Sequence, residues 1–347
     1  MAPIRWFVLM VFFTTAAQAQ SWSVQTSGLD TDFRGVSAAY FSDSNGAQIP
    51  VVWAAGSNGV ILRSVDAGKT WKRIHVQDGE TLNFRSLSAF DSKVAYVVSV
   101  GLSEKSRIYK TTDGGETWKL QYSDKRKDFF LDAIACLSRT RCLALGDPID
   151  GKFLILVTED GEHWKELPRD NMPAALPKEG AFAASGSCLI AQGENIYFGT
   201  GSPAARVFHS PDLGHTWTVT ETPIASGKPT AGIFSLNAGP AATLFAVGGD
   251  YNDPSSSDRV AAVSRDRGKT WQLSGQQPAG FRSAVASIGK EIVLAVGPTG
   301  EDISRDGGAH WERTDSLNLN AIVVLDERRI WAVGPKGTIA RFVNQEK

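Results

Sequence analysis

The sequence predicts an all-β protein, a seven-bladed β-propeller of four-stranded blades, and two features lead to this prediction. A motif, Ser/Thr-x-Asp-x-Gly-x-x-Trp, recurs along the chain, and its tryptophans are 40 to 54 residues apart. That spacing is the length of one four-stranded propeller blade. Short β-like runs with turn signals lie between the copies, and no amphipathic helical pattern competes with them.

The motif has the chemistry of a hairpin turn. In the first copy, Ser64 and Asp66 offer side-chain oxygens to backbone N–H groups, Gly68 adopts a positive φ, and Trp71 opens the next strand. The copy at residues 158–164 is one residue short. We therefore interpret the motif aspartates as structural residues: Asp66, Asp113, Asp160, Asp212, Asp266 and Asp306.

The count of blades depends on how the chain ends. Six complete blades end near residues 75, 122, 168, 222, 275 and 314. A seventh starts at Leu319 and stops at Phe342 without a motif or a fourth strand. Residues 21–25 resemble that missing strand, and their pairing into the last blade closes the ring and removes two open edges. Rings of six or eight blades are the alternatives.

The N-terminus predicts export. Arg5 precedes an apolar run at residues 6–13 that is too short to span a bilayer, and Ala17 and Ala19 form a small-x-small cleavage site. We therefore expect a signal peptide at residues 1–19, cleaved after Ala19, and one propeller domain at residues 20–347 of a periplasmic or secreted protein that does not span the membrane. A buried N-terminal helix is the alternative.

The cysteines are consistent with an oxidising compartment. Cys136 and Cys142 flank a tight turn and face each other in a hairpin, which favours a disulfide; two buried thiols are the alternative. Cys188 is expected to be buried and inert. No Cys/His spacing resembles a metal site, and no cofactor is predicted. The oxygen-rich loops 147–151 and 250–258 could bind calcium, but neither has EF-hand spacing, so solvated loops are expected and calcium stays an open alternative.

A binding site is expected at the axial mouth opposite the motif turns, where first strands begin and second strands end. The residues expected there are Arg34, Arg85, Arg282, Asp132, Glu179, Asn320, Asp147 and Asp250. Converging arginines suit carboxylates and phosphates, so the mouth is predicted to bind an anionic ligand or an acidic partner surface. In the alternative interpretation, the recurrent Phe-Arg pairs are structural and each arginine pairs with a neighbouring carboxylate.

The motif is that of the Asp-box, or BNR repeat, of sialidases and other propellers. Through these motifs, the Ala-Val-Gly strand ends and the closing strand, the chain resembles the photosystem II stability/assembly factor family of exported propellers. Members of that family are assembly scaffolds, so the resemblance implies binding rather than catalysis. A likeness to sialidases would make Arg34, Arg85 and Arg282 an arginine triad. It would make Asp132 or Asp147 the acid and Glu179 the carboxylate of the nucleophile pair. No tyrosine occupies a clear nucleophile position.

The leading hypothesis is a non-enzymatic binding or assembly scaffold for a protein partner in the cell envelope. The alternative is a glycan-binding or glycoside-hydrolysing propeller that uses the arginines and carboxylates of the mouth. The net charge of -1, from 36 basic and 37 acidic residues, gives no basic excess for nucleic acid. A monomer is expected.

Overall fold

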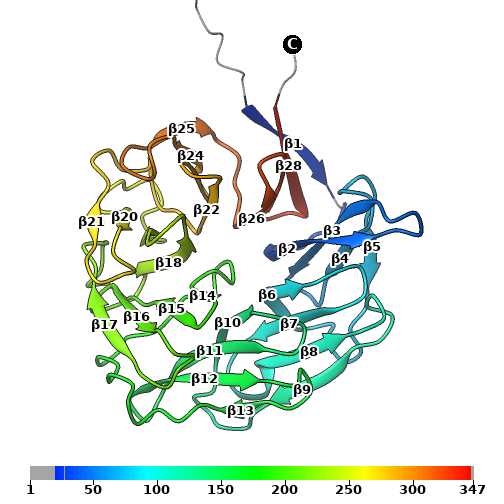
Figure 1. Cartoon of the computed structure of the whole chain (residues 1–347), viewed down its shortest axis with the longest axis horizontal. Helices are drawn as coiled ribbons and strands as arrows, with labels where there is room; N and C mark the ends of the chain where they lie inside the picture. Colours follow the sequence, from blue (N-terminus) through cyan, green and yellow to red (C-terminus); the bar gives the residue numbers. More distant parts are fainter. Residues whose placement is uncertain (1–19, 27, 345–347) are drawn as a thin grey trace, which may run out of the picture.

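The computed structural model describes residues 20–26 and 28–344, which form seven antiparallel four-stranded sheets around a central axis (Figure 1). The prediction of an all-β, seven-bladed propeller is confirmed. The first strands of neighbouring blades contact one another all the way round the ring. The predicted signal peptide, residues 1–19, lies outside the described residues.

The first four blades follow the chain in order. Blade 1 comprises β2 (Phe33–Ser42), β3 (Gln48–Gly56), β4 (Ile61–Ser64) and β5 (Lys72–Ile74). Blade 2 comprises β6 (Asn83–Ala89), β7 (Ala95–Val100), β8 (Arg107–Thr111) and β9 (Lys119–Ser123), with a short 3-10 helix, η1 (Ser103–Lys105). Blade 3 comprises β10 (Leu131–Cys136), β11 (Cys142–Ile149), β12 (Lys152–Thr158) and β13 (Lys165–Glu166). Blade 4 comprises β14 (Leu189–Gln192), β15 (Asn195–Gly199), β16 (Arg206–Ser210) and β17 (Thr218–Glu221).

The last three blades complete the ring. Blade 5 comprises β18 (Ala231–Ala238), β19 (Leu244–Asp250), β20 (Ala261–Ser264) and β21 (Gln272–Leu273). Blade 6 comprises β22 (Ala284–Ile288), β23 (Ile292–Gly297), β24 (Gly300–Ser304) and β25 (Glu312–Asp315). Blade 7 comprises β26 (Ala321–Asp326), β27 (Arg329–Val333), β28 (Thr338–Asn344) and, from the start of the chain, β1 (Gln20–Thr26).

The N-terminal strand closes the ring, as predicted. Strand β1 pairs antiparallel with β28, with Trp22 opposite Phe342. The two rings meet edge-on with their centroids 5.0 Å apart. The indole Nε1 of Trp22 donates a hydrogen bond of 2.6 Å to Oε2 of Glu301, which lies on β24 of blade 6. Closure therefore joins the two ends of the chain and also ties blade 7 to blade 6.

The carboxyl of Glu301 makes this closure sensitive to pH. Burial raises its pKa to about 7 from the usual 4.5, against hydrogen bonds from Thr314 and Trp22 that lower it. A carboxyl with a raised pKa in the folded state contributes full stability below about pH 4.5, and this contribution is lost as the pH rises through 7.

We therefore expect Glu301→Gln to leave the free energy of unfolding nearly unchanged at pH 4 and to increase it at pH 8. The gain at pH 8 should be roughly 3 kcal/mol, because each unit of raised pKa corresponds to about 1.4 kcal/mol. Urea unfolding at both pH values measures it. An equal change at pH 4 and pH 8 would contradict the assignment, and Glu312→Gln, on an exposed position of β25, is the control.

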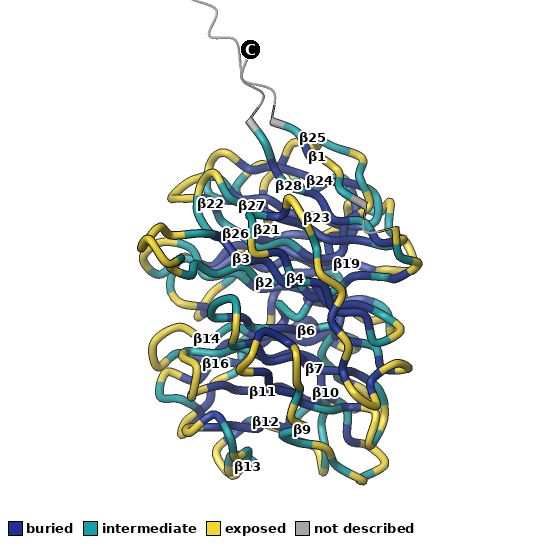
Figure 2. Tube along the Cα trace, turned by 90° about the vertical axis from the view of Figure 1, so that its right-hand side faces the viewer, coloured by how far each residue is buried: buried dark blue, intermediate teal, exposed yellow. Residues whose placement is uncertain are grey.

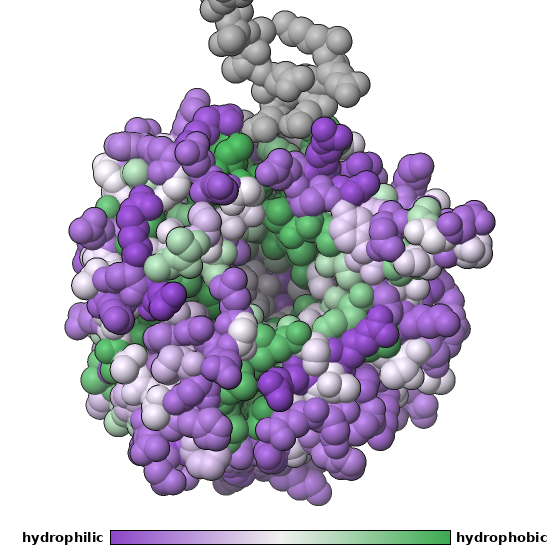
Figure 3. All heavy atoms as spheres, viewed as in Figure 1, coloured by the Kyte–Doolittle hydropathy of each residue, from purple (hydrophilic) through white to green (hydrophobic). Residues whose placement is uncertain are grey.

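The hydrophobic core of the described residues is divided among the junctions between blades. Seven buried clusters each join two neighbouring blades, including the junction of blade 7 with blade 1. Buried residues accordingly follow the strands, and exposed residues gather in the turns at the two faces (Figure 2). The centre of the ring is hollowed, with hydrophobic residues around its rim (Figure 3). Each blade is therefore held mainly by its two neighbours.

The Asp-box turns show the hydrogen bonds expected from the motif. In blade 1, the Ser64 hydroxyl accepts from Gly68 N at 2.8 Å and donates to Asp66 at 2.7 Å, while Asp66 accepts from Thr70 N at 2.9 Å. Gly68 has a φ of +83°, which a residue with a side chain rarely adopts. The same bonds recur at Asp113, Asp212 and Asp266. At Asp306 the bond from the fourth residue comes from His310 N.

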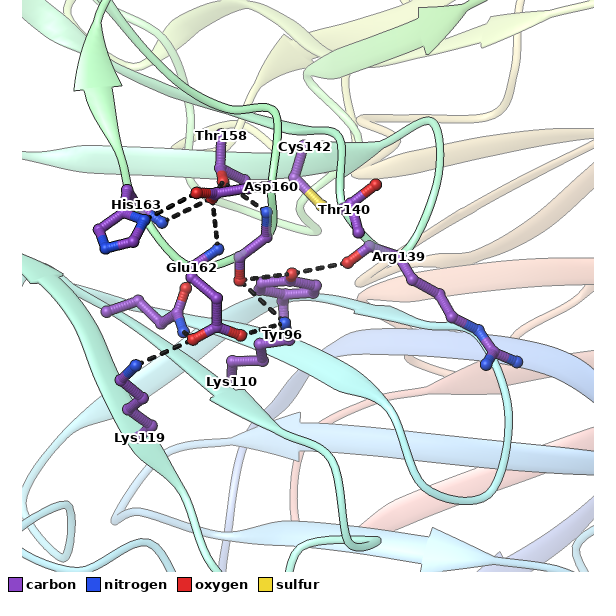
Figure 4. A network of polar contacts seen from close by, with 12 residues as sticks. Tyr96, Lys110, Lys119, Arg139, Thr140, Cys142, Thr158, Asp160, Glu162 and His163 are labelled. Atoms are coloured by element: carbon purple, nitrogen blue, oxygen red, sulfur yellow. Dashed lines mark hydrogen bonds and ion pairs between the residues drawn. The ribbon is translucent and has the colours of Figure 1, made fainter.

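The shortened Asp-box of blade 3 also contacts blade 2 (Figure 4). There, Lys110 Nζ donates to Gly161 O at 2.9 Å and to Glu162 at 2.7 Å, and the Tyr96 hydroxyl donates to Gly161 O at 3.1 Å. His163 Nδ1 lies 2.7 Å from Asp160 Oδ2 in the same turn. The Asp160 carboxylate thus has partners within its own turn, consistent with a structural role.

A disulfide joins Cys136, at the end of β10, to Cys142, at the start of β11. These two residues are register partners across the hairpin. Cys188 is free and buried.

Candidate functional site

Four of the first strands carry a β-bulge at the same place in the repeat. The register of each with its second strand shifts by one residue near its start, which leaves one residue unpaired. The unpaired residues are Arg34 in β2, Arg85 in β6, Asp132 in β10 and Phe234 in β18. Bulges reorient side chains, and they are common beside functional sites.

The four bulged residues line one pocket at the axial mouth, of about 520 Å³, which we call the axial pocket. Its wall is completed by the starts of the remaining first strands and by the ends of second strands. These additional lining residues include Phe130, Asp147, Ala181, Phe182, Ala183, Ala184, Tyr251, Phe281, Ser283, Pro298 and Asn320. Five of the eight residues expected at the mouth therefore share this pocket: Arg34, Arg85, Asp132, Asp147 and Asn320.

The segment at residues 180–186, which precedes β14, lies against this pocket, and we call it the axial loop. It makes contacts with five other blades. The loop carbonyls of Ala184 and Ala183 accept hydrogen bonds from Arg34 Nη1 at 3.4 Å and Arg85 Nη1 at 3.0 Å. The loop groups Ala181 N and Ser185 Oγ donate to Asp147 Oδ1 at 3.0 Å and Ser283 O at 2.8 Å. The ring of Phe182 stacks on that of Phe234. The axial loop therefore fixes the shape of the pocket from one side.

The basic side of the pocket is formed by blades 1 and 2. Arg34 Nε donates to Asp32 Oδ2 at 2.8 Å, and Asn320 Nδ2 donates to Asp32 Oδ1 at 2.6 Å. Arg85 forms no ion pair within 4.0 Å in the part of the chain that the structure describes. Burial, followed by repulsion from Arg34, lowers the pKa of Arg85. An arginine without a carboxylate partner beside a pocket is suited to receive an anion.

The acidic side of the pocket is formed by blade 3. Asp132 is fully buried, and neither of its carboxyl oxygens accepts a hydrogen bond from a described residue. Burial, then the charge of Asp147, raises the pKa of Asp132 well above its usual value, while Arg85 opposes the shift. Burial also raises the pKa of Asp147 to about 6, against the hydrogen bond from Ala181 N. A fully buried carboxyl without a hydrogen-bond partner, such as that of Asp132, is typical of functional sites.

The third side of the pocket is aromatic. Phe182 of the axial loop stacks on Phe234 with ring centroids 3.9 Å apart, and Phe281 meets Phe234 edge-on at 4.7 Å. Tyr251, which is 48% exposed, meets the rings of Phe182 and Phe234 edge-on. Together these rings offer an apolar wall beside the charged groups.

Arg282 does not line the pocket because it is one residue out of register with the other arginines. In blades 1, 3 and 5, the residue after the bulge pairs with the residue that precedes a glycine of the second strand, as Gly35 pairs with Ala55. In blade 6 that residue is Ala284, which pairs with Val296. Ser283 therefore holds the bulge position, and Arg282 precedes it. A shift of one residue turns a side chain to the other side of a strand.

The side chain of Arg282 is instead fully buried in blade 6. Its Nε donates to Asp302 Oδ2 at 2.6 Å, and its Nη1 donates to Phe281 O at 2.8 Å and to Thr299 Oγ1 at 2.9 Å. The arginine triad expected from a likeness to sialidases is therefore not assembled, because Arg34, Arg85 and Arg282 do not converge on one pocket.

Glu179 and Asp250 also have partners outside the pocket. The Glu179 carboxylate accepts hydrogen bonds from Thr200 Oγ1 at 2.6 Å and Leu176 N at 2.7 Å. It also accepts from Nε and Nη2 of Arg206. The carboxylate of Asp250 accepts from Lys228 Nζ at 2.9 Å, Thr230 Oγ1 at 2.6 Å and Asn252 N at 3.0 Å. Each carboxylate thus anchors a segment next to the pocket: the axial loop after Glu179 and the Tyr251 loop after Asp250.

The aromatic wall was not predicted from the sequence. Phe234 occupies the position of Arg34 in the repeat, but that position was expected to carry polar residues. The spacing in sequence between Phe234 and Gly248 could have revealed the equivalence, since Ile233 pairs with Gly248 as Phe33 pairs with Gly56. Phe182 gave no such signal, because blade 4 replaces the usual strand start with the axial loop.

No group of three or more His, Cys, Asp and Glu side chains within residues 20–26 and 28–344 is placed to hold a metal ion. In the same residues, no helix has the length and hydrophobicity needed to cross a membrane.

Comparisons with known proteins agree with the repeat and the architecture. The family model described as "BNR/Asp-box repeat" matches residues 109–120, the region of the Asp113 turn. The chain therefore combines Asp-box turns with a seven-bladed propeller fold. Its fold is similar to the solved structure titled "YCF48 bound to D1 peptide", with a TM-score of 0.66 and 18% identity over 93% of this chain and 97% of the other. It is equally similar to YCF48 from Cyanidioschyzon merolae, with a TM-score of 0.66 and 17% identity over 93% of this chain and 98% of that one.

Two curated relatives match parts of this Asp-box propeller. One is the photosystem II assembly lipoprotein Ycf48 of Synechococcus sp. (strain CC9902), 32% identical over 75 residues, which are 21% of this chain and 20% of the relative. The other is the vacuolar protein sorting/targeting protein 10 of Colletotrichum graminicola, 29% identical over 127 residues, which are 36% of this chain and 8% of the relative. The matched segments thus span a fifth or less of these relatives. The resemblance to photosystem II assembly factor propellers is confirmed.

Proposed function

We propose that this Asp-box propeller is an exported scaffold that binds a segment of a partner protein in the axial pocket. The observation that carries the proposal is the set of bulges, which direct Arg34, Arg85, Asp132 and Phe234 into one pocket. Charged groups next to aromatic rings are typical of surfaces that recognise peptides, because rings supply contact area and charges supply orientation.

The comparisons support this proposal. One propeller of similar fold is titled as bound to a D1 peptide, and one relative is named as an assembly lipoprotein. Another relative is named as a sorting and targeting protein. The predicted signal peptide at residues 1–19 adds export to the proposal, and the protein partner is then one of the cell envelope.

A random 12-residue peptide library tests this proposal, with the purified chain as bait and fluorescence polarisation of the selected peptides as the readout. We expect peptides that compete for one site and bind at least tenfold more weakly to Arg85→Gln and to Phe234→Ala. A hydrogen bond to a charged group contributes about 1.5–3 kcal/mol, which corresponds to roughly a 10- to 100-fold change in Kd.

The matched control is Arg265→Gln, because Arg265 is an exposed arginine that likewise donates to a backbone carbonyl, that of Gly307 at 3.4 Å. Its substitution removes the same charge far from the pocket residues. Selected peptides that bind wild type, Arg85→Gln and Phe234→Ala equally well would refute the axial pocket as the binding site.

A further inference from the structure

The acidic side of the axial pocket has unused hydrogen-bond acceptors. Asp132 follows Leu131 and Asp147 follows Gly146, and Leu131 and Gly146 are register partners, so the two carboxyls lie side by side across the β10–β11 hairpin. Both oxygens of Asp132 lack a hydrogen bond from any described residue, although Asp132 is fully buried. Asp147 Oδ1 accepts from Ala181 N, and no hydrogen bond between described residues uses its Oδ2.

The charges of the pocket favour a cation at this place. Two arginines, Arg34 and Arg85, share the pocket region with three carboxyls, Asp32, Asp132 and Asp147, which leaves one excess negative charge when all five ionise. Asp32 is already paired with Arg34 at 2.8 Å. The excess is therefore located on blade 3, opposed only by Arg85.

We propose that Asp132 and Asp147 form a subsite that receives a primary ammonium group of the bound peptide. An ammonium has three N–H donors and no acceptor, and the three free acceptors are Asp132 Oδ1, Asp132 Oδ2 and Asp147 Oδ2. A compact ammonium also matches a buried carboxyl better than the broader guanidinium fork of arginine. This inference rests on the proposed function, since it names one chemical feature of the ligand.

Binding of a cation at this subsite is coupled to protons. The groups that face Asp132 are Asp147 on β11, Arg85 on β6 and the buried thiol of Cys188 before β14. Because the two carboxyls hold protons more tightly than exposed ones, an arriving ammonium must displace a proton from the pair. Affinity for the ammonium should therefore rise between pH 5 and pH 8.

The probe for the subsite is n-butylammonium, the head of a lysine side chain, observed by saturation-transfer NMR with n-butanol as the neutral analogue. We expect wild type to bind n-butylammonium saturably, and the apparent Kd to rise at least tenfold in Asp132→Asn and in Asp147→Asn. The control Asp258→Asn removes an equal charge from an exposed loop residue and should leave the Kd unchanged. Equal signals for n-butanol and n-butylammonium would overturn the inference.

Arg85→Gln separates this inference from the proposed function. The substitution should weaken selected peptides but strengthen n-butylammonium binding, because it removes the one positive charge that opposes the subsite. Suppose that wild type binds no n-butylammonium while selected peptides still bind more weakly to Arg85→Gln than to wild type. That result would support the proposed scaffold function and exclude the ammonium subsite.

The source of the ammonium follows from the selected peptides. If replacing a lysine of the peptide by norleucine raises the Kd at least tenfold, the subsite binds a lysine side chain. If N-acetylation of the peptide raises the Kd as much, the subsite binds an N-terminus. If neither change alters binding to wild type, the subsite is not used by peptides and the inference is wrong.

Discussion

Trp22→Ala is expected to lower the free energy of unfolding by about 3–5 kcal/mol, the usual cost of removing a large aromatic side chain from a core. Trp22 is only 8% exposed, it contacts Phe342 edge-on, and it donates to Glu301 across the junction with blade 6. Its loss removes apolar contact from the strand that closes the ring and leaves the buried Glu301 with one hydrogen bond fewer. Guanidinium unfolding measures the change.

Val24→Ala is the control on the same strand, because Val24 is 49% exposed and should cost below about 1 kcal/mol. Trp22→Phe should lower the free energy of unfolding by an amount between those of the two alanine variants, since it retains an aromatic ring but loses the indole N–H. If Trp22→Ala and Val24→Ala destabilise the protein equally, β1 does not close the ring through Trp22.

Arg282→Met is the second large effect, with an expected loss of about 3–5 kcal/mol in the free energy of unfolding. The ion pair of Arg282 with Asp302 is almost fully buried, with side chains 0% and 1% exposed. Removing one partner leaves the other charge buried without compensation. By contrast, Arg34→Met breaks a half-exposed pair with Asp32 and should cost about 1 kcal/mol or less.

The double variant Arg282→Met/Asp302→Leu should recover most of this loss, because apolar pairs of similar volume often replace buried ion pairs without penalty. It should also bind selected peptides as wild type does, since neither residue lines the axial pocket. If the folded double variant binds selected peptides tenfold more weakly than wild type, Arg282 contributes to the binding site after all.

The functional and structural arginines therefore differ in ways that can be measured. Arg85, with no ion pair to a described carboxylate, should affect ligand binding more than stability. Arg282, which is buried and paired with Asp302, should affect stability more than binding. Both follow a phenylalanine in the sequence, so only their register in the strand distinguishes them.

The sequence by itself determined the fold, because each blade repeats its own local signals. Ser64, Asp66, Gly68 and Trp71 define a turn through bonds within eight residues. The same pattern recurs in four further blades and, one residue shorter, in blade 3. The short seventh blade and the Trp22 strand then determined how the ring closes. Hydrogen bonds within a turn and the pairing of neighbouring strands can be predicted from the spacing of motif residues along the sequence.

Only the tertiary structure decided which candidates share a site. A one-residue difference in strand register turned Arg282 into the core, although its sequence context matches that of Arg34 and Arg85. The axial loop brought Phe182 onto Phe234, and close packing buried Asp132 without a described partner. Side-chain direction and burial depend on contacts between blades, which are distant in sequence, so repeat spacing alone does not specify them.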